Sequence, residues 1–84
     1  MINQVYVIKD SVSEQCTPLF LAANDVAAKR QFAAFLKDVQ YPREDFNLYH
    51  VGSFASDCVQ LLGISHIHLQ NGSQVEIIPN VQPT

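Results

Sequence analysis

Five basic residues are the first candidates for chemistry, because their spacing could bring several of them to one surface. Arg30 and Lys37 lie seven positions apart in a stretch that favours helix, so we expect them on one helix side with Lys29 beside them. Lys9 and Arg43 lie near the ends of neighbouring predicted elements and could join this surface. Such a patch could contact phosphate groups. The alternative is an ordinary solvated helix face, since the charges are few.

Two tyrosines in predicted strands suggest a second kind of contact. Tyr6 and Tyr49 carry flat rings that could stack on unpaired bases, as in proteins that bind single strands. The alternative is that both rings pack into the sheet or into a dimer contact, because strands favour aromatic residues in any case.

Two histidines have a spacing that metal ligands can use. His66 and His68 are two positions apart in a predicted strand and therefore share a face. A complete site needs a third ligand, which only His50, Cys16 or Cys58 could supply, and none stands at a diagnostic spacing. We therefore expect exposed or hydrogen-bonded histidines, with no metal and no other cofactor.

No group of residues in the sequence is typical of catalysis. Glu44 and Asp45 follow Pro42 in a turn and should be solvated, whereas a general acid and base pair needs a cleft with two distinct environments. A nucleophile elbow and a glycine-rich phosphate loop are missing, since the glycines at 52, 63 and 72 are isolated. We expect that the protein is not an enzyme.

Composition narrows the functional classes further. Only 15% of the 84 residues are charged and 48% are apolar, against a usual charged share of about 25%. A surface so poor in charge indicates a homodimer or larger homo-oligomer. The net charge of −3 argues against nucleic-acid binding through bulk charge, so such binding would need a local basic cluster together with stacking.

The chain shows no sign of export or of a membrane span. It has neither a long apolar run nor a basic segment followed by an apolar one, so we expect no contact with a membrane. Cys16 and Cys58 lack a C-x-x-C spacing, and we expect both as reduced thiols in a cytoplasm.

The elements that would position these side chains begin with two strands and a helix. β-Branched and aromatic residues predict an inner strand over 3–9. A second strand is expected over 16–22, with Pro18 placing it at an edge or bulge. Asn24 is a good N-cap for a helix over 25–39. The helix stripe that should pack on the sheet consists of Ala28, Phe32, Phe35, Leu36 and Val39.

The rest of the chain predicts further strands. Residues 46–54 alternate as a strand, and residues 58–63 fit either a strand or a helical turn. Asn71-Gly72 between the runs 64–70 and 73–78 predicts a hairpin, and the tail 79–84 should fray. The order β-β-α-β-(β)-β-β predicts one α+β domain over 1–84, with an antiparallel sheet of four to six strands and one amphipathic helix on a face.

Several short motifs give the chain a resemblance to a known family. They are Val5-Tyr6-Val7-Ile8-Lys9-Asp10, Pro18-Leu19-Phe20, Asn24-Asp25, Ala28-x-Arg30-x-Phe32 and Pro42-x-Glu44-Asp45-Phe46-x-Leu48-Tyr49-x-x-Gly52-x-Phe54. In their order and spacing the chain resembles the small nonstructural protein of gokushovirus-type microviruses, which are phages with single-stranded DNA genomes. The resemblance covers residues 3–54. The C-terminal third departs from the usual ending of that family.

The resemblance implies a DNA-binding protein of the host bacterial cytoplasm that helps direct replication toward single-stranded genomes for packaging. Single-stranded DNA would then be the partner of Lys9, Lys29, Arg30, Lys37, Arg43, Tyr6 and Tyr49, and Arg30 also matches the family pattern. The alternative is a non-enzymatic assembly module that makes no contact with nucleic acid. Such a module fits the net charge and the charge-poor surface. Salt dependence separates the two, because phosphate contacts weaken steeply as salt rises.

Overall fold

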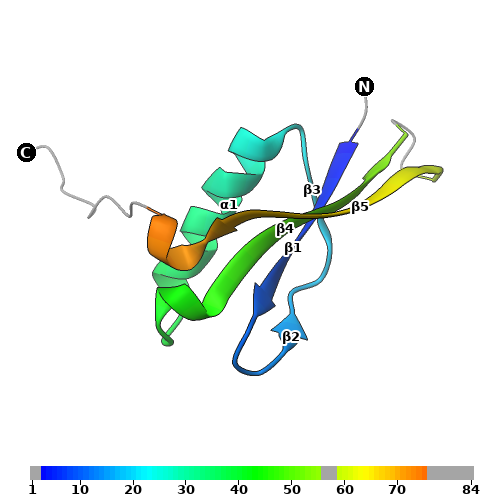
Figure 1. Ribbon diagram of the computed structural model, residues 1–84. Coiled ribbons are helices and arrows are strands. Elements are labelled where there is room, and N and C mark those ends of the chain that lie inside the picture. The colour runs from blue at the N-terminus through cyan, green and yellow to red at the C-terminus, as the bar shows by residue number, and fades with distance from the viewer. Residues whose placement is uncertain (1–2, 56–58, 76–84) are drawn as a thin grey trace, which may run out of the picture.

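One α-helix packs on one side of a five-stranded antiparallel sheet in the computed structural model, which describes residues 3–55 and 59–75 (Figure 1). The strand order is β2-β1-β4-β5, and β3 also pairs with β1. The elements are β1 (Asn3–Asp10), β2 (Gln15–Cys16), β3 (Phe20–Ala22), α1 (Asp25–Asp38), β4 (Phe46–Phe54) and β5 (Leu61–Asn71), with two short 3₁₀ helices, η1 (Arg43–Asp45) and η2 (Gly72–Gln74). The predicted α+β class with one helix is confirmed.

The inner position predicted for the first strand is confirmed, because β1 pairs on both sides and its residues 5–8 are buried. The second predicted strand, 16–22, forms as two short pieces instead. Pro18 has no N–H to give to a ladder. Only Thr17 bridges the gap: its N–H donates to the Ile8 carbonyl at 2.9 Å, and its hydroxyl accepts from the Ile8 N–H at 3.1 Å.

The helix begins where the sequence predicts and ends one residue early. The Asn24 side chain caps it by accepting a hydrogen bond from the Ala27 N–H at 2.8 Å. Ala28, Phe32 and Leu36 are buried on its inner side. They form the core with sheet residues that point toward the helix, namely Tyr6, Ile8, Phe46 and Leu48. The predicted packing stripe is therefore correct.

The hairpin predicted at Asn71-Gly72 is wrong. A two-residue hairpin turn of this composition needs positive φ values, and no described glycine has one. Asn71 instead caps η2: its side chain accepts from the Ser73 N–H at 2.9 Å, while the Gln74 side chain accepts from the Asn71 N–H at 2.7 Å. Residues 73–75 follow as 3₁₀ helix and loop, and 76–78 lie outside the described residues.

The true partner of the fifth strand is β4. β5 runs antiparallel to it over Leu61–Asn71, with register shifts at three places. This strand takes in both 64–70, predicted as strand, and 61–63, which the sequence left open between strand and helix. Residues 56–58 and the predicted frayed tail 79–84 lie outside the described residues.

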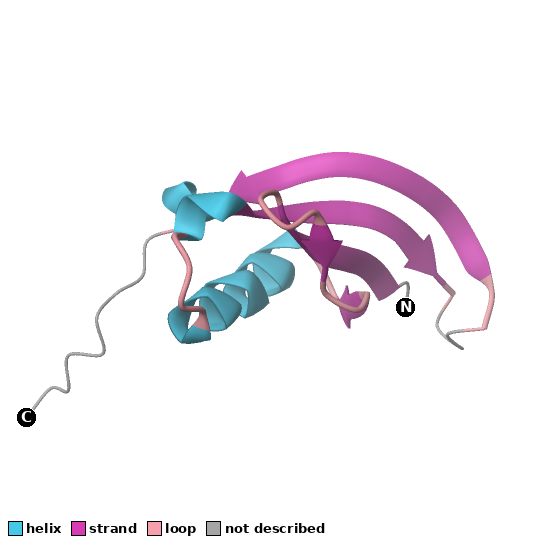
Figure 2. Ribbon diagram, turned by 90° about the horizontal axis from the view of Figure 1, so that it is seen from below, coloured by secondary structure: helices cyan, strands magenta, loops and turns pink. Residues whose placement is uncertain are grey.

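The two faces of the sheet have different surroundings. Opposed residues of antiparallel strands share a face, so the register assigns each residue to a side. The side away from α1, called the open face below, has no described helix over it (Figure 2). Three of its cross-strand rows are Leu21–Val5–Gly52–Ile64, Val7–Tyr49–His68 and Cys16–Lys9–Asn47–Asn71, and the row Asn3–Phe54–Leu61 lies beyond them at the end of the sheet.

Among the described residues, no helix is both long and apolar enough to span a membrane.

Candidate nucleic-acid interface

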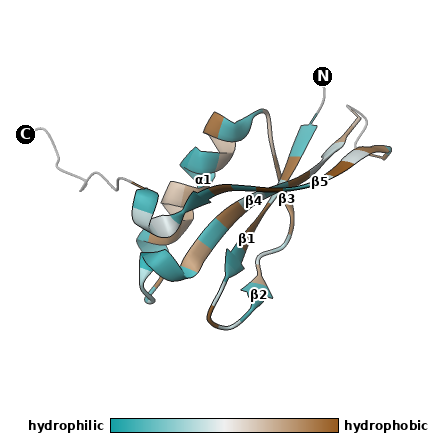
Figure 3. Ribbon diagram, in the orientation of Figure 1, coloured by the Kyte–Doolittle hydropathy of each residue, from teal (hydrophilic) through white to brown (hydrophobic). Residues whose placement is uncertain are grey.

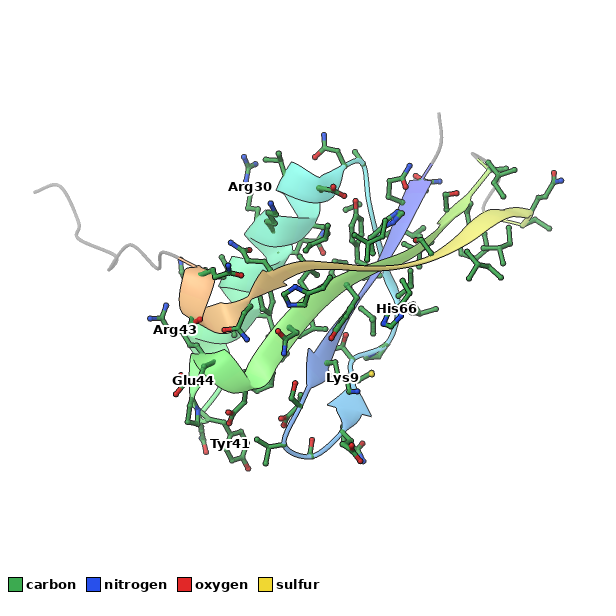
Figure 4. All side chains as sticks on the ribbon, in the orientation of Figure 1. Lys9, Arg30, Tyr41, Arg43, Glu44 and His66 are labelled. Atoms are coloured by element: carbon green, nitrogen blue, oxygen red, sulfur yellow. The ribbon has the colours of Figure 1, made fainter. Side chains whose placement is uncertain are left out.

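The basic residues singled out in the sequence fall on two sides of the molecule. Lys29, Arg30 and Lys37 are exposed on α1, and Arg30 points away from the sheet (Figure 4). Lys9 lies on the opposite side, in the open face, where its strand position pairs with Asn47. The structure therefore separates Lys9 from the helix cations, and the five residues do not form one patch.

Arg43 has a structural contact that the sequence did not suggest. Its guanidinium Nη1 donates a hydrogen bond to the carbonyl oxygen of Val75 at 2.9 Å. Val75 is buried in the core, directly after η2. Arg43 thus joins η1 to the end of the described chain, and a phosphate would compete with that bond.

Tyr6 is not available for stacking on a base. Its side chain is fully buried on the helix side of β1, with its ring beside those of Phe20 and His50. Its hydroxyl donates to Asp25 Oδ1 at 2.8 Å. Burial, this hydrogen bond and the Asp25 charge raise the pKa of the Tyr6 hydroxyl above its ordinary value of 10.0. The stacking role predicted for Tyr6 is wrong, because a buried ring offers no face to a ligand.

Tyr49, unlike Tyr6, lies on the side of the sheet away from the helix. It lies in the middle row of the open face and is half-buried. The His66 ring stacks on it with centroids 5.5 Å apart and planes at 29°, and the His68 ring meets it edge-on at 5.3 Å and 73°. The His66 side chain is visible on the far side of the sheet from α1 (Figure 4). Three rings from β4 and β5 therefore form one aromatic cluster.

Hydrogen bonds hold one ring of this aromatic cluster, that of His68, in place. Asn47 Oδ1 accepts from His68 Nε2 at 2.8 Å and from Asn71 Nδ2 at 2.9 Å. The Asn47 amide also donates to the Ser11 hydroxyl at 2.9 Å. These bonds orient the His68 ring and fix the polar row that includes Lys9. A ring held in this way needs little reordering when a flat ligand binds.

The open face is free of carboxylates along its strands. The chain carries eight acidic residues against five basic ones, yet none of the three rows contains Asp or Glu. Asp10 belongs to the helix side, opposite Phe46, and the hydrogen bond from the Val12 N–H lowers the pKa of its carboxyl. Lys9 is therefore the one formally charged residue in these rows.

The described histidines and cysteine do not assemble as a metal site. His50 points toward the helix side, where its ring bonds Gln4 and Ser65, each at 2.8 Å. Cys16 is exposed at the outer strand of the third row, and Cys58 lies outside the described residues. Within 3–55 and 59–75, no three His, Cys, Asp or Glu side chains gather in a way that could hold an ion.

The sequence did not reveal that His66 and His68 lie beside Tyr49. The His-x-His alternation correctly gave His66 and His68 a common face, but it did not connect that face with Tyr49. That connection depends on the pairing of Tyr49 with His68 across β4 and β5. The predicted hairpin gave β5 a different partner strand, so this register could not be found.

Comparison with known proteins gives one family. Neither the curated proteins nor the solved structures contain a significant match to this chain. The family model described as Phage ORF5 protein matches residues 3–75. The match continues past residue 54, so β5 and η2 are part of the family pattern and the expected C-terminal departure is wrong up to residue 75. The chain belongs to the Phage ORF5 protein family.

Proposed function

We propose that this phage protein binds single-stranded DNA across its open face. The observation that carries the proposal is the Tyr49–His66–His68 cluster, which lies beside Lys9 on a face whose strand rows hold no carboxylate. Unpaired bases stack on aromatic rings at sheet surfaces, while basic side chains contact the phosphates.

The preference for single strands follows from the kind of contact. Bases within a duplex are already stacked on each other, so a flat ring on a sheet can reach only unpaired bases. One lysine would neutralise few phosphates, so we expect a modest affinity for DNA. Stacking should then contribute the larger share of the binding free energy.

The outer side of α1 is a weaker candidate for the same role. It carries Lys29, Arg30 and Lys37, but Asp25 and Asp38 lie at the two ends of the same helix. None of its exposed residues is aromatic. Without a ring to stack on, such a face would bind through charge alone, which suits a chain of net charge −3 poorly.

In the phage cycle, such binding would let the protein cover newly made single strands in the host cytoplasm. This would assist single-stranded genome synthesis or packaging, the role that the resemblance to microvirus nonstructural proteins implies. We expect the protein to act as a homo-oligomer, because several copies along one strand multiply weak contacts.

The test is binding of labelled oligothymidylate, with a duplex of equal length as reference, at about 50 and 200 mM salt. We compare Tyr49→Ala with Tyr41→Ala, because Tyr41 is 67% exposed but lies outside the open face (Figure 4). Loss of one stacking contact of about 1–3 kcal/mol should raise the Kd of Tyr49→Ala roughly 5- to 150-fold. Tyr41→Ala should bind as the wild type does.

A second pair of variants identifies the charged face. Lys9→Gln should weaken binding and reduce the salt slope by about 0.7, the value for one lost phosphate contact on a single strand. Lys37→Gln should do neither. The proposal fails if the wild type shows no binding, or if only the helix substitution weakens it.

A protein-assembly role without DNA is the second candidate. The observation that favours it is the set of exposed apolar side chains at one end of the sheet, Leu61, Leu62 and Ile64. An assembly held by such side chains should respond little to salt, and it should leave oligothymidylate unbound.

A further inference from the structure

β5 forms an edge of the sheet that lacks most of the usual protective features. It pairs with β4 on one side, and no described strand lies on the other. Its eleven residues include no proline and no Asp, Glu, Lys or Arg. Natural edge strands avoid pairing with other chains through charges, prolines, shortness or bulges. Only bulges are present here, in the pairing with β4.

The opposite edge of the sheet is protected in the usual way. β2 and β3 contain two and three residues, and Pro18 lies between them. A second chain could add only a few hydrogen bonds there. The contrast singles out β5, the longest strand, as the edge where a further strand can add.

Several apolar side chains on β5 are exposed to solvent, and pairing with another strand would bury part of their surface. Ile64 is 84% exposed, and Leu61, Leu62 and Ile67 are about half exposed. Hydrophobic residues gather at the outer end of β5 (Figure 3). Exposed apolar side chains concentrated on one element are typical of interaction surfaces.

The helix side of β5 is also only partly covered. α1 packs over β1, β3 and β4, which leaves a hollow between its N-terminus and β5. Val26 from the helix and Ile67 and Leu69 from β5 contribute apolar side chains to this hollow, whose lining also includes Gln4, Asn24, Asp25 and His50. Apolar side chains therefore extend from the strand edge into part of the helix side.

We propose that β5 pairs antiparallel with β5 of a second copy, so that the two sheets become continuous. A twofold axis perpendicular to the sheet keeps both helices on one side, and the partly apolar hollows of the two copies then face each other. Charge favours a second copy: the whole chain has net charge −3, but two β5 strands meet without any formal charge. Backbone hydrogen bonds supply affinity and the apolar side chains supply burial.

The pairing would place the two open faces next to each other. Each copy adds its own Tyr49, His66 and His68, so one DNA strand could contact both clusters. This consequence rests on the proposed DNA binding, whereas the pairing itself does not. Linking two weak sites in this way raises affinity without any new type of contact.

The test measures oligomeric state without DNA, by size-exclusion chromatography with light scattering at several concentrations. The wild type should show a mass twice the 9.4 kDa of one chain. Ile64→Lys and Ile67→Lys place a charge on the edge and should yield the single-chain mass. Val12→Lys is the matched control, because Val12 is 74% exposed in the turn after β1 and should leave the dimer intact. Circular dichroism establishes that each variant is folded.

The outcomes separate this inference from the proposed function. A wild type that stays monomeric at all concentrations overturns it, and so does a dimer that both charged variants retain. A dimer that both variants dissociate supports it, whether or not the wild type binds oligothymidylate. If DNA binding holds, the monomeric Ile67→Lys variant should still bind a short oligonucleotide and lose affinity mainly for a longer one.

Discussion

At the scale of single residues, Tyr6 shows how one hydrogen bond couples the sheet to the helix. Its hydroxyl bonds Asp25 in the first turn of α1, while its ring fills the core. The charged form of Tyr6 would be buried beside a carboxylate, which is why its pKa rises. The residue is structural, and its substitution should change stability before any binding property.

Tyr6 predicts a specific loss of stability in alkali. The hydroxyl has its ordinary pKa of 10.0 in the unfolded chain and a higher pKa in the folded one. The folded chain therefore holds this proton more tightly, so the contribution is complete below pH 10.0 and is lost as the pH rises further. Urea unfolding of wild type and Tyr6→Phe should show a smaller alkaline loss in the variant. At neutral pH the variant should be less stable by about 1 kcal/mol.

Tyr49 is also a tyrosine of the sheet, but its surroundings differ from those of Tyr6. Tyr49 and Tyr6 sit in adjacent strands, but Tyr49 opposes Val7 and so points to the other face. Alternation within each strand follows from sequence. The sequence does not show which face of the sheet the helix covers, because β1 has apolar residues on both sides. Val5 and Val7 lie on one side, Tyr6 and Ile8 lie on the other, and all four are buried.

At the scale of elements, the two 3₁₀ helices are joined by close backbone contact. Gly72 begins η2 directly against η1, and a Cβ atom added at Gly72 would overlap the carbonyl oxygen of Arg43. The Arg43 side chain fastens the same junction through Val75. This contact explains why the chain turns away from β5 at Asn71 without forming a hairpin.

The junction predicts different effects for two glycine substitutions. Gly72→Ala should destabilise the protein by about 1–3 kcal/mol, since backbone atoms must move to admit the methyl group. Gly63→Ala is the control, because its Cβ would meet only Ser53 Oγ at an ordinary 3.5 Å. Urea midpoints measure both. Equal midpoints for the two variants would contradict the account of the junction.

Local sequence patterns were sufficient to predict β1, α1 and β4. A β-branched run, an Asn24 cap with an apolar stripe, and an alternating run each favour one structure only. Asn71-Gly72 was ambiguous, because an Asn side chain serves equally well in a tight turn and as a helix cap. The contact with Arg43, distant in sequence, decided between them. Pro18 was only partly informative. It predicted an irregular strand over 16–22, but it did not predict that this strand would form as two pieces, β2 and β3.

At the scale of the whole molecule, the proposed DNA binding depends on which face of the sheet the helix leaves open. The thin shape, 17 Å along its shortest axis, leaves both the outer side of α1 and the open face accessible to ligands. The sequence singled out Lys9 and Tyr49, which lie on the open face, and Lys29, Arg30 and Lys37, which lie on the other side. It could not separate these groups, because that separation is made by the packing of the helix and the register of the strands.

DNA binding on the open face can be tested by photo-cross-linking of the wild-type protein to oligothymidylate that carries a photoreactive thymine analogue. Mass spectrometry of the digested product then identifies the residues that contact the bases. We predict cross-links on β4 and β5, at Tyr49 and His66. Cross-links confined to α1 around Arg30, or none at all, would contradict DNA binding on the open face.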